Sequence, residues 1–361
     1  MVHITNSYSA TIGGAERIVR YIHTHSLANG VDSKVIGLYH NNPNQENLPK
    51  AITIGDKTPY GPRVVWALYK ALKRYNKPSC LLHVHLFPAI FYIALFKKLG
   101  LLKAKTVVTE HSTSNNRRAK WYGKFLDRFI FRSYQKVFAI SEGVAESLIE
   151  RSIIKSNQVE VVTNGAILPF SAPIERSRKS PIEIISVGSL RKAKNFENAL
   201  KALSSLTHLN WHYTIAGEGE LQEKLEMLIR KEGLVDHVTL AGRVDPLNDF
   251  LTQADLFLMP SAWEGFGLAA VEAMNASLPV VLSNVAGLKE LVYLNESTLP
   301  FAKLINPEDI SEIAEVLEEV LVNFEKYRSF AREAFVHSLK FSSQAMAEKY
   351  FKHYFNLKGI V

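Results

Sequence analysis

The sequence has one cysteine, Cys80, among its 361 residues. A single thiol excludes an internal disulfide framework and a cysteine-built zinc site, and it suits a reducing compartment. Long apolar runs are also missing. The most apolar stretch, residues 86–96, is about half of the ~20 residues that a membrane-spanning helix needs. The first residues, MVHITNSYSA, lack the basic start and apolar core of a secretory leader. We therefore expect a cytoplasmic protein.

Acidic residues are scarce in residues 57–136, which contain 17 basic residues but only two acids, Glu110 and Asp127. Aromatic residues are interleaved with the cations, as in RVVWALYKALKRYNK and RRAKWYGKFLDRFIFR. This combination on a helical face favours the inner surface of an anionic membrane, where each cation contributes ~1 kcal/mol. The sequence shows no nucleic-acid-binding module, so we expect no nucleic-acid partner. A merely solvated basic face is the alternative.

Short β-rich runs alternate with amphipathic helical stretches along most of the chain, which predicts βα units and parallel, doubly wound sheets. The pattern is interrupted by LPFSAPIERSRKSP, which is rich in proline, serine and charge. We predict an α/β protein with two Rossmann-like domains facing across a cleft. The predicted segments are a first domain at 1–168, a linker at 169–181, a second domain at 182–335 and a terminal helix at 336–361.

Ligands of doubly wound folds bind at the carboxyl ends of the strands, so the loops that follow strands are the candidates for chemistry. SVGSLRKAKNF places Arg191, Lys192 and Lys194 between a strand and a helix. Cations and free backbone N–H groups at a helix start predict a phosphate or diphosphate site. A solvated loop would have the same composition.

Two glycine loops allow close approach of a ligand. Gly217 and Gly219 resemble half of a dinucleotide fingerprint, but the third glycine is missing, so the signal for NAD is weak. Gly242 lets the backbone at Val244 approach a flat ring, such as a nucleobase, although a plain turn explains the glycine equally well.

The most informative stretch is WEGFGLAAVEAM, residues 263–274. Glu264 follows a strand, and Gly265 and Gly267 permit a tight turn that presents N–H groups at a helix start. Glu272 lies about one turn into that helix, where its carboxylate can accept hydrogen bonds from vicinal hydroxyls. Two glutamates at this spacing predict a site for a sugar, a diphosphate and a ribose.

The first domain offers fewer signals. Gly13 and Gly14 form a close-approach loop after the first strand, without the lysine of a P-loop. His111 ends a strand in TEHST and is expected to face the cleft. Five histidines are expected to be structural: His83, His85, His208, His212 and His237.

These motifs, in this order, resemble glycosyltransferase family 4, a large retaining group with the GT-B fold. The likeness covers nearly the whole chain and includes the Gly13-Gly14 loop, TEHST, VGSLRKAKNF, LAGRV and the E-x7-E pair of Glu264 and Glu272. It implies that the terminal helix crosses back to the first domain. Two departures are Ser189, where the family often has arginine that Arg191 would replace, and NGAI at 164–167 in place of NGVD.

The resemblance also implies roles for individual residues. Glu272 would bind the donor ribose, Glu264 the ring hydroxyls of the transferred sugar, and Lys194 the leaving diphosphate, with Arg191 beside it. The backbone at Gly242 and Val244 would pair with the base. The sugar and diphosphate would be lined by Gly265, Phe266, Gly267 and Leu268. On the acceptor side, His111 would lie against the donor sugar, and Gly13 and Gly14 between the diphosphate and the acceptor, with Gly14 also binding the donor. His111, Glu264 and Lys194 would be the catalytic residues.

The sequence thus predicts a metal-independent, retaining glycosyltransferase that needs no cofactor, with a nucleoside-diphosphate sugar as co-substrate, UDP being favoured. The expected acceptor is a lipid-linked or cell-surface glycan at the cytoplasmic membrane face, as in bacterial polysaccharide or lipopolysaccharide assembly. A nucleotide-sugar epimerase of the same fold and a non-catalytic nucleotide-sugar-binding subunit are the alternatives. An NAD-dependent oxidoreductase is disfavoured by the incomplete glycine fingerprint.

Overall fold

The computed structural model describes residues 1–8, 13–39, 48–55, 57–113, 120–150, 154–176 and 180–358. The chain divides into two compact units, which we call unit 1 (Met1–Gly165 with Ser343–Val361) and unit 2 (Ala166–Ser342). Each unit contains its own parallel sheet, as the alternation of strands and helices predicted. The sequence predicted a first domain that ends at residue 168, a linker that ends at 181 and a second domain that ends at 335.

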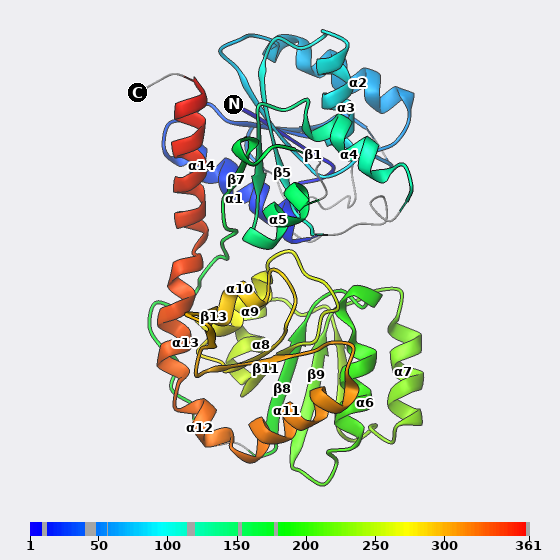
Figure 1. The fold of residues 1–361 in the computed structure, drawn as a ribbon, viewed down its shortest axis with the longest axis vertical. Coiled ribbons are helices and arrows are strands. Elements are labelled where there is room, and N and C mark those ends of the chain that lie inside the picture. Colours follow the sequence, from blue (N-terminus) through cyan, green and yellow to red (C-terminus); the bar gives the residue numbers. More distant parts are fainter. Residues whose placement is uncertain are drawn as a thin grey trace. The chain divides into compact units, whose positions relative to one another are not determined.

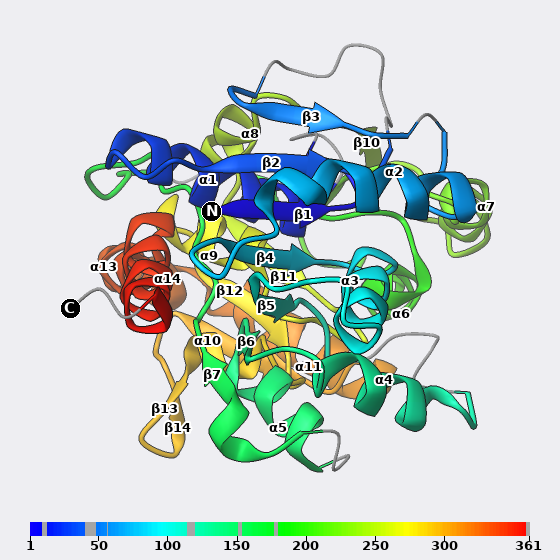
Figure 2. The same ribbon diagram turned by 90° about the horizontal axis from the view of Figure 1, so that it is seen from above.

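The sheet of unit 1 is parallel, with the strand order β3-β2-β1-β4-β5-β6-β7. Figure 2 shows β3, β2, β1 and β4 one below another in that order. All four residues of β1 are buried, as expected for a strand covered on both faces. The strands are β1 (Val2–Thr5), β2 (Lys34–Gly37), β3 (Ala51–Thr53), β4 (Leu81–His85), β5 (Lys105–Glu110), β6 (Lys136–Ala139) and β7 (Val159–Val161).

Helices connect these strands, and the last helix of the chain also belongs to unit 1. That helix packs against α1, and it buries Tyr350 and Tyr354 against the sheet. The helices are α1 (Gly14–Ala28), α2 (Pro62–Leu72), α3 (Ala89–Lys98), α4 (Gly123–Phe131), α5 (Glu142–Glu150) and α14 (Ser343–Lys358), with short 3-10 turns η1 (Lys73–Tyr75) and η2 (Ser156–Gln158).

The main sheet of unit 2 is also parallel, with the order β10-β9-β8-β11-β12-β15. Its core includes the fully buried rings of Trp211 and Tyr213. The strands are β8 (Ile182–Val187), β9 (Trp211–Ala216), β10 (Val238–Gly242), β11 (Leu256–Met259), β12 (Val280–Ser283) and β15 (Ala302–Ile305), with a small hairpin of β13 (Tyr293–Leu294) and β14 (Ser297–Thr298).

The helices of unit 2 flank this sheet (Figure 1). One of them, α11, begins at a side-chain cap, since the Asp309 carboxylate accepts hydrogen bonds from the N–H groups of Ser311 and Glu312. The helices are α6 (Phe196–Ser204), α7 (Gln222–Lys231), α8 (Leu247–Gln253), α9 (Leu268–Asn275), α10 (Lys289–Val292), α11 (Ile310–Val322), α12 (Phe324–Arg328) and α13 (Ala331–Ser338), with η3 (Lys192–Lys194) and η4 (Leu339–Phe341).

The terminal helix expected at 336–361 corresponds to α14, which begins at Ser343, later than expected. Helix α13 packs against α9 in unit 2, η4 follows it, and α14 begins at Ser343. In the part of the chain that the structure describes, no helix is both long enough and apolar enough to cross a bilayer.

The segment expected to be a linker belongs to unit 2 and is hydrogen-bonded to the rest of it at several positions. The Asn275 side chain accepts a hydrogen bond from the Phe170 N–H at 3.1 Å and donates to the Phe170 carbonyl at 3.4 Å. Its amide also donates to the Ser338 hydroxyl at 3.2 Å. Further along, Ile174 donates its N–H to the Ser277 hydroxyl at 2.9 Å. Asn275, the last residue of α9, therefore holds two segments in place: the one around Phe170, where the chain enters unit 2, and the one around Ser338, shortly before the chain leaves it.

We expect Asn275→Ala to lower the free energy of unfolding of unit 2 by about 1–3 kcal/mol, because it leaves partly buried backbone groups of Phe170 without partners. Chemical denaturation followed by circular dichroism measures the loss. Asn323→Ala is the matched control, since Asn323 is exposed and makes one hydrogen bond to the Glu319 carbonyl. Equal effects of the two substitutions would contradict this role for Asn275.

Candidate functional site

The carboxyl edge of the unit 2 sheet contains a topological switch point. From β8 the chain proceeds to β9 and β10 on one side, whereas β11 and β12 lie on the other side. Strands β8 and β11 are neighbours and run parallel. The loops that follow them lie at the position where doubly wound sheets usually bind ligands.

The loop after β8 carries Lys194 at the end of η3. The lysine stem lies against Gly188, because a Cβ added there would be 3.1 Å from the lysine Cε. The carbonyl of Ala193 accepts a hydrogen bond from the N–H of Ala262 at 2.9 Å. This bond joins the loop after β8 to the loop after β11 and fixes their separation.

Lys194 and Glu264 form an ion pair across the switch point. The Lys194 Nζ donates to the Glu264 Oε2 at 2.5 Å, and the two side chains are only 20% and 19% exposed. The other carboxylate oxygen, Oε1, accepts the N–H of Gly265 at 2.9 Å. These two functional candidates are 70 positions apart in the sequence, and the fold brings them into direct contact.

Competing effects set the pKa of Glu264. Burial by itself would raise it, but the charge and hydrogen bond of Lys194, together with the N–H groups of Gly265 and Phe266, outweigh burial and lower the pKa below its ordinary value. Glu264 is therefore ionised at neutral pH, so the pair carries no net charge until a ligand engages it.

The sign of this shift gives a pH prediction. A carboxyl whose pKa is lower in the folded state stabilises the fold above its ordinary pKa, here 4.5. That stability is lost as the pH falls through the folded-state pKa. We expect the difference in unfolding free energy between wild type and Glu264→Gln to shrink on acidification below pH 4.5. Urea titrations at several pH values measure it, and a difference that stays constant with pH would contradict the assignment.

Two glycines shape the loop that carries Glu264. Gly267 caps helix α9 with φ +90, in the left-handed region that favours glycine. Gly287, with φ +88, lies so close that a Cβ there would be 2.7 Å from the Gly265 carbonyl carbon and oxygen. The loop after β12 therefore packs closely against the backbone carbonyl groups of Glu264 and Gly265. The sequence indicated Gly267, but nothing local indicated the packing role of Gly287.

Glu272 lies on α9, the helix that follows the loop of Glu264, and it is more deeply buried than Glu264. It is 4% exposed, whereas Leu268 at the start of α9 is half-buried. Phe266, in the turn before the helix, is 2% exposed and packs edge-on against Phe341. Ser261, just after β11, is fully buried with no described hydrogen-bond partner for its hydroxyl. The sequence did not single out this serine.

The remaining predicted donor residues lie on neighbouring loops of the same edge. Arg191 and Lys192 are exposed, and Val244 is half-buried. Gly242 has φ +64, and its carbonyl accepts the N–H of Gly217 at 2.7 Å, which joins the loops after β9 and β10. The predicted donor residues of unit 2 thus lie on loops at one edge of its sheet and on the helix that follows, whereas Gly14 lies in unit 1.

His111 and the Gly13-Gly14 loop belong to unit 1. Gly13 caps α1 in an extended conformation, close to the carboxylate of the buried Glu16. Burial raises the pKa of Glu16. Residues 9–12 of this loop lie outside the described residues. His111 follows β5 and hydrogen-bonds through Nε2 to His85 at 3.3 Å.

Three histidines of unit 1 place nitrogen atoms close enough to be considered as metal ligands. One ring nitrogen each of His3, His83 and His85 lies within 4.8 Å of the others, and all three residues are buried. However, His83 uses both nitrogens in hydrogen bonds, one to Tyr354 and one to Thr109. As expected for structural residues, His83 and His85 are enclosed in the core of unit 1.

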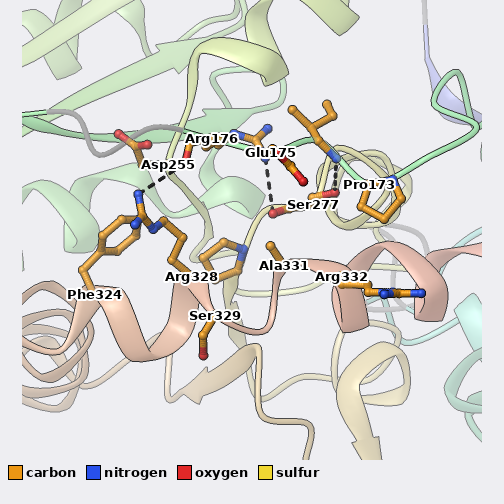
Figure 3. A pocket seen from close by; sticks show the side chains of 12 residues that line it. Pro173, Glu175, Arg176, Asp255, Ser277, Phe324, Arg328, Ser329, Ala331 and Arg332 are labelled. Atoms are coloured by element: carbon orange, nitrogen blue, oxygen red, sulfur yellow. Dashed lines mark hydrogen bonds between the residues drawn. The ribbon is translucent and has the colours of Figure 1, made fainter.

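A cavity of about 620 Å³ lies elsewhere in unit 2. Its lining includes Asp255, which precedes β11, and Ser277, which precedes β12, so it lies at the amino edge of the sheet. Figure 3 shows Arg176 hydrogen-bonded to Ser277 there. Burial lowers the pKa of Arg176 to about 10, against the opposing effect of Asp255. The cavity is separate from the switch point.

Family comparisons cover both units. Residues 12–168 match the family model described as Glycosyltransferase Family 4, and residues 170–336 match the model described as Glycosyl transferases group 1. The two matches together cover nearly the whole chain.

Curated relatives include glycosyltransferases of larger size. A glycogen synthase of Mycobacterium tuberculosis is 31% identical over 229 residues, which are 60% of this chain and 54% of the relative. The chain thus spans about half the length of that relative. An uncharacterized 41.2 kDa protein in the cps region of Klebsiella pneumoniae is 28% identical, covering 80% and 81%. The serotype-specific mannosyltransferase WbdA of Escherichia coli is 30% identical, covering 59% and 28%.

Solved structures share the fold. A sucrose-phosphate synthase from Thermosynechococcus elongatus has a TM-score of 0.82 at 19% identity, covering 100% of this chain and 99% of that one. Anabaena HepE, in complex with UDP-glucose, has a TM-score of 0.81 at 17% identity, covering 98% and 99%. The lipopolysaccharide outer core galactosyltransferase WaaB has a TM-score of 0.74 at 17% identity, with the same coverage. The chain therefore belongs to glycosyltransferase family 4 and has the GT-B fold.

Proposed function

We propose that this glycosyltransferase transfers a hexosyl or N-acetylhexosaminyl group from a UDP-sugar to a hydroxyl of a lipid-linked or cell-surface glycan, with retention at the anomeric carbon. The observation that carries the proposal is the Lys194–Glu264 pair at the switch point between β8 and β11. Support for the donor comes from HepE, which shares the fold and binds UDP-glucose. Support for the acceptor comes from the cps-region relative and from WbdA.

Each of the residues around the switch point contacts a different part of the donor. When the donor binds, the Lys194 ammonium leaves the Glu264 carboxylate and pairs with the diphosphate. The released carboxylate then accepts hydrogen bonds from hydroxyls of the sugar. The backbone from Gly265 to Leu268 lines the sugar and diphosphate at the start of α9. Glu272 holds the ribose, and the backbone of Val244 pairs with the base.

During transfer, the acceptor oxygen bonds to the anomeric carbon on the face from which the diphosphate departs. The bond between that carbon and the diphosphate oxygen breaks, and the acceptor proton passes to the departing diphosphate. Such chemistry depends on positioning and on stabilising the negative charge that develops. Lys194 supplies the positive charge, so we propose that no metal is required and that activity survives chelation by EDTA.

The test incubates the protein with UDP-glucose, UDP-galactose and their N-acetyl counterparts, with and without a polyprenyl-diphosphate glycan. The expected result is an acceptor-dependent glycoside whose anomeric coupling constant in NMR matches that of the donor. Isomerised donor without acceptor would indicate the epimerase. Binding without any turnover would indicate a non-catalytic subunit, and inverted product would contradict retention.

We also propose that unit 1 binds the cytoplasmic face of an anionic membrane. Helix α2 exposes Trp66 by 59%, with the Lys70 ammonium 3.6 Å from the ring centre. At the start of α4, Trp121 and Phe125 are 86% and 67% exposed. Helices α2 and α4 both pack on α3 through aromatic pairs. Residues 114–119 of this basic region lie outside the described residues.

Charge reversal of Lys70 and Lys73 to glutamate is expected to weaken binding to phosphatidylglycerol vesicles about 30-fold or more, at ~1 kcal/mol for each lost cation. Flotation at low salt measures it. Reversal of Lys349 and Lys352, on α14 of the same unit, is the control and should change binding much less. Equal effects of both pairs, or binding that ignores lipid charge, would contradict the assignment.

A further inference from the structure

A row of histidines runs through the buried interior of unit 1 and ends at His111. The Nδ1 of His3, on β1, lies 3.3 Å from the Nε2 of His85, on β4. The Nδ1 of His85 lies 3.3 Å from the Nε2 of His111, just after β5. His3 and His85 are fully buried. The three imidazoles therefore form a hydrogen-bonded chain between neighbouring strands of one sheet.

All three rings are neutral at physiological pH. Burial lowers the pKa of His3 to about 3 and that of His111 to about 4. Burial also lowers the pKa of His85 well below its ordinary value. A neutral imidazole has one N–H and one lone pair. Because each contact needs one donor and one acceptor, the protons of all three rings must point the same way along the chain.

The far end of the chain decides between the two directions. The Nε2 of His3 is buried, and it has no hydrogen-bond partner among the described residues. If the protons point toward His3, this nitrogen is a buried N–H without an acceptor. If they point toward His111, it is a buried lone pair without a donor. Buried donors are left unpaired more rarely than buried acceptors, so the second direction is favoured.

We infer that His3 and His85 hold His111 as its Nδ1–H tautomer, so that His111 presents a hydrogen-bond donor, rather than a base, on its remaining ring nitrogen. His3 Nδ1–H donates to His85 Nε2, and His85 Nδ1–H donates to His111 Nε2. His85 and His3 are positioning residues in this arrangement. The ligand that receives the His111 hydrogen bond is an oxygen of the sugar donor or acceptor, and this last step rests on the proposed function.

A metal ion held by His3, His83 and His85 would require a different arrangement. The hydrogen bond between His3 and His85 occupies a lone pair that a metal would need. His83 would have to give up its 2.6 Å bond to Tyr354 or its 2.7 Å bond to Thr109. The hydrogen-bonded chain satisfies these atoms without such losses, so the contacts favour a proton chain over a metal centre.

The direct test uses the unliganded wild-type protein labelled with 15N-histidine at neutral pH. Long-range 1H–15N spectra distinguish the tautomers, and loss of one set of signals in His111→Asn assigns that ring. The expected pattern for His111 is a protonated Nδ1 and an unprotonated Nε2. A protonated Nε2 would overturn the inference, as would one equivalent of zinc in the purified protein that His3→Leu removes.

Two substitutions at the far end test whether the chain transmits the tautomer. His3→Leu removes the donor to His85, so His85 and His111 are expected to change tautomer or to average between the two. His3→Asn keeps an amide donor near the position of Nδ1 and is expected to restore the wild-type pattern. An unchanged His111 in a folded His3→Leu would overturn the inference. None of these spectra involves a sugar nucleotide, so failure of the proposed function would leave them intact.

Discussion

Replacing Lys194 by methionine is expected to lower the rate of sugar transfer about 100- to 1000-fold, the usual effect of removing one group that stabilises developing negative charge. Methionine keeps the unbranched stem that lies against Gly188 but lacks the ammonium group. The loss of transfer should fall mainly on kcat. The free energy of unfolding should fall as well, because the largely buried Glu264 carboxylate loses its charge partner. Steady-state kinetics with the preferred donor measure the loss of transfer.

Lys192→Met is the matched control, because Lys192 belongs to the same 3-10 turn but is exposed. It should lower kcat much less than Lys194→Met does, because the Lys192 side chain is exposed whereas Lys194 is largely buried and paired with Glu264. Combining Lys194→Met with Glu264→Gln should give less than the sum of the two separate losses, since the side chains are in direct contact. If Lys194→Met transferred sugar at the wild-type rate, the Lys194–Glu264 pair would not be part of the active site.

Gly287→Ala is expected to destabilise unit 2 by about 2–4 kcal/mol and to lower transfer about 100-fold. The left-handed backbone costs an alanine about 1–2 kcal/mol. The added Cβ would meet the backbone of Gly265, whose atoms lie at 2.7 Å. The loop that carries Glu264 must therefore move, and small displacements of positioning groups are costly to catalysis.

Gly233→Ala is the control that separates the cost of backbone strain from the effect of the contact with Gly265. Gly233 also has a positive φ of +70, but nothing lies within 4 Å of its would-be Cβ. Its substitution should cost only the backbone strain of about 1–2 kcal/mol and leave transfer unchanged. Thermal unfolding and kinetics of both variants make the comparison. If Gly287→Ala behaves like Gly233→Ala in both, the loop after β12 does not position Glu264.

The donor half of the site could be predicted because its signals are local. Glu264, Gly267 and Lys194 each lie in a loop between a recognisable strand and helix, and parallel strands bring such loops to one edge. The contact between Lys194 and Glu264 follows from the strand order, in which β8 and β11 are neighbours. A sequence pattern predicts strands but not which strands are adjacent, so the ion pair itself was not predicted.

Other features depend on contacts that leave no local trace. The supporting role of Gly287 is visible only beside Gly265, and the histidine chain needs His3 and His85 on adjacent strands. The H-x-H spacing did place His83 and His85 on one face of a strand, which was a usable signal. The linker was predicted from composition, but Asn275 binds its first residues to unit 2.

The central claim is that the loops around the switch point bind a nucleoside diphosphate. The most direct measurement is the thermal stability of wild type and Glu272→Ala with UDP, GDP, ADP and NAD. At about 100 times its dissociation constant, a ligand should stabilise the protein by about 2.7 kcal/mol. The account predicts a clear increase in melting temperature with one nucleoside diphosphate, UDP being favoured, and its loss in Glu272→Ala. No increase with any of them, or an increase with NAD alone, would contradict it.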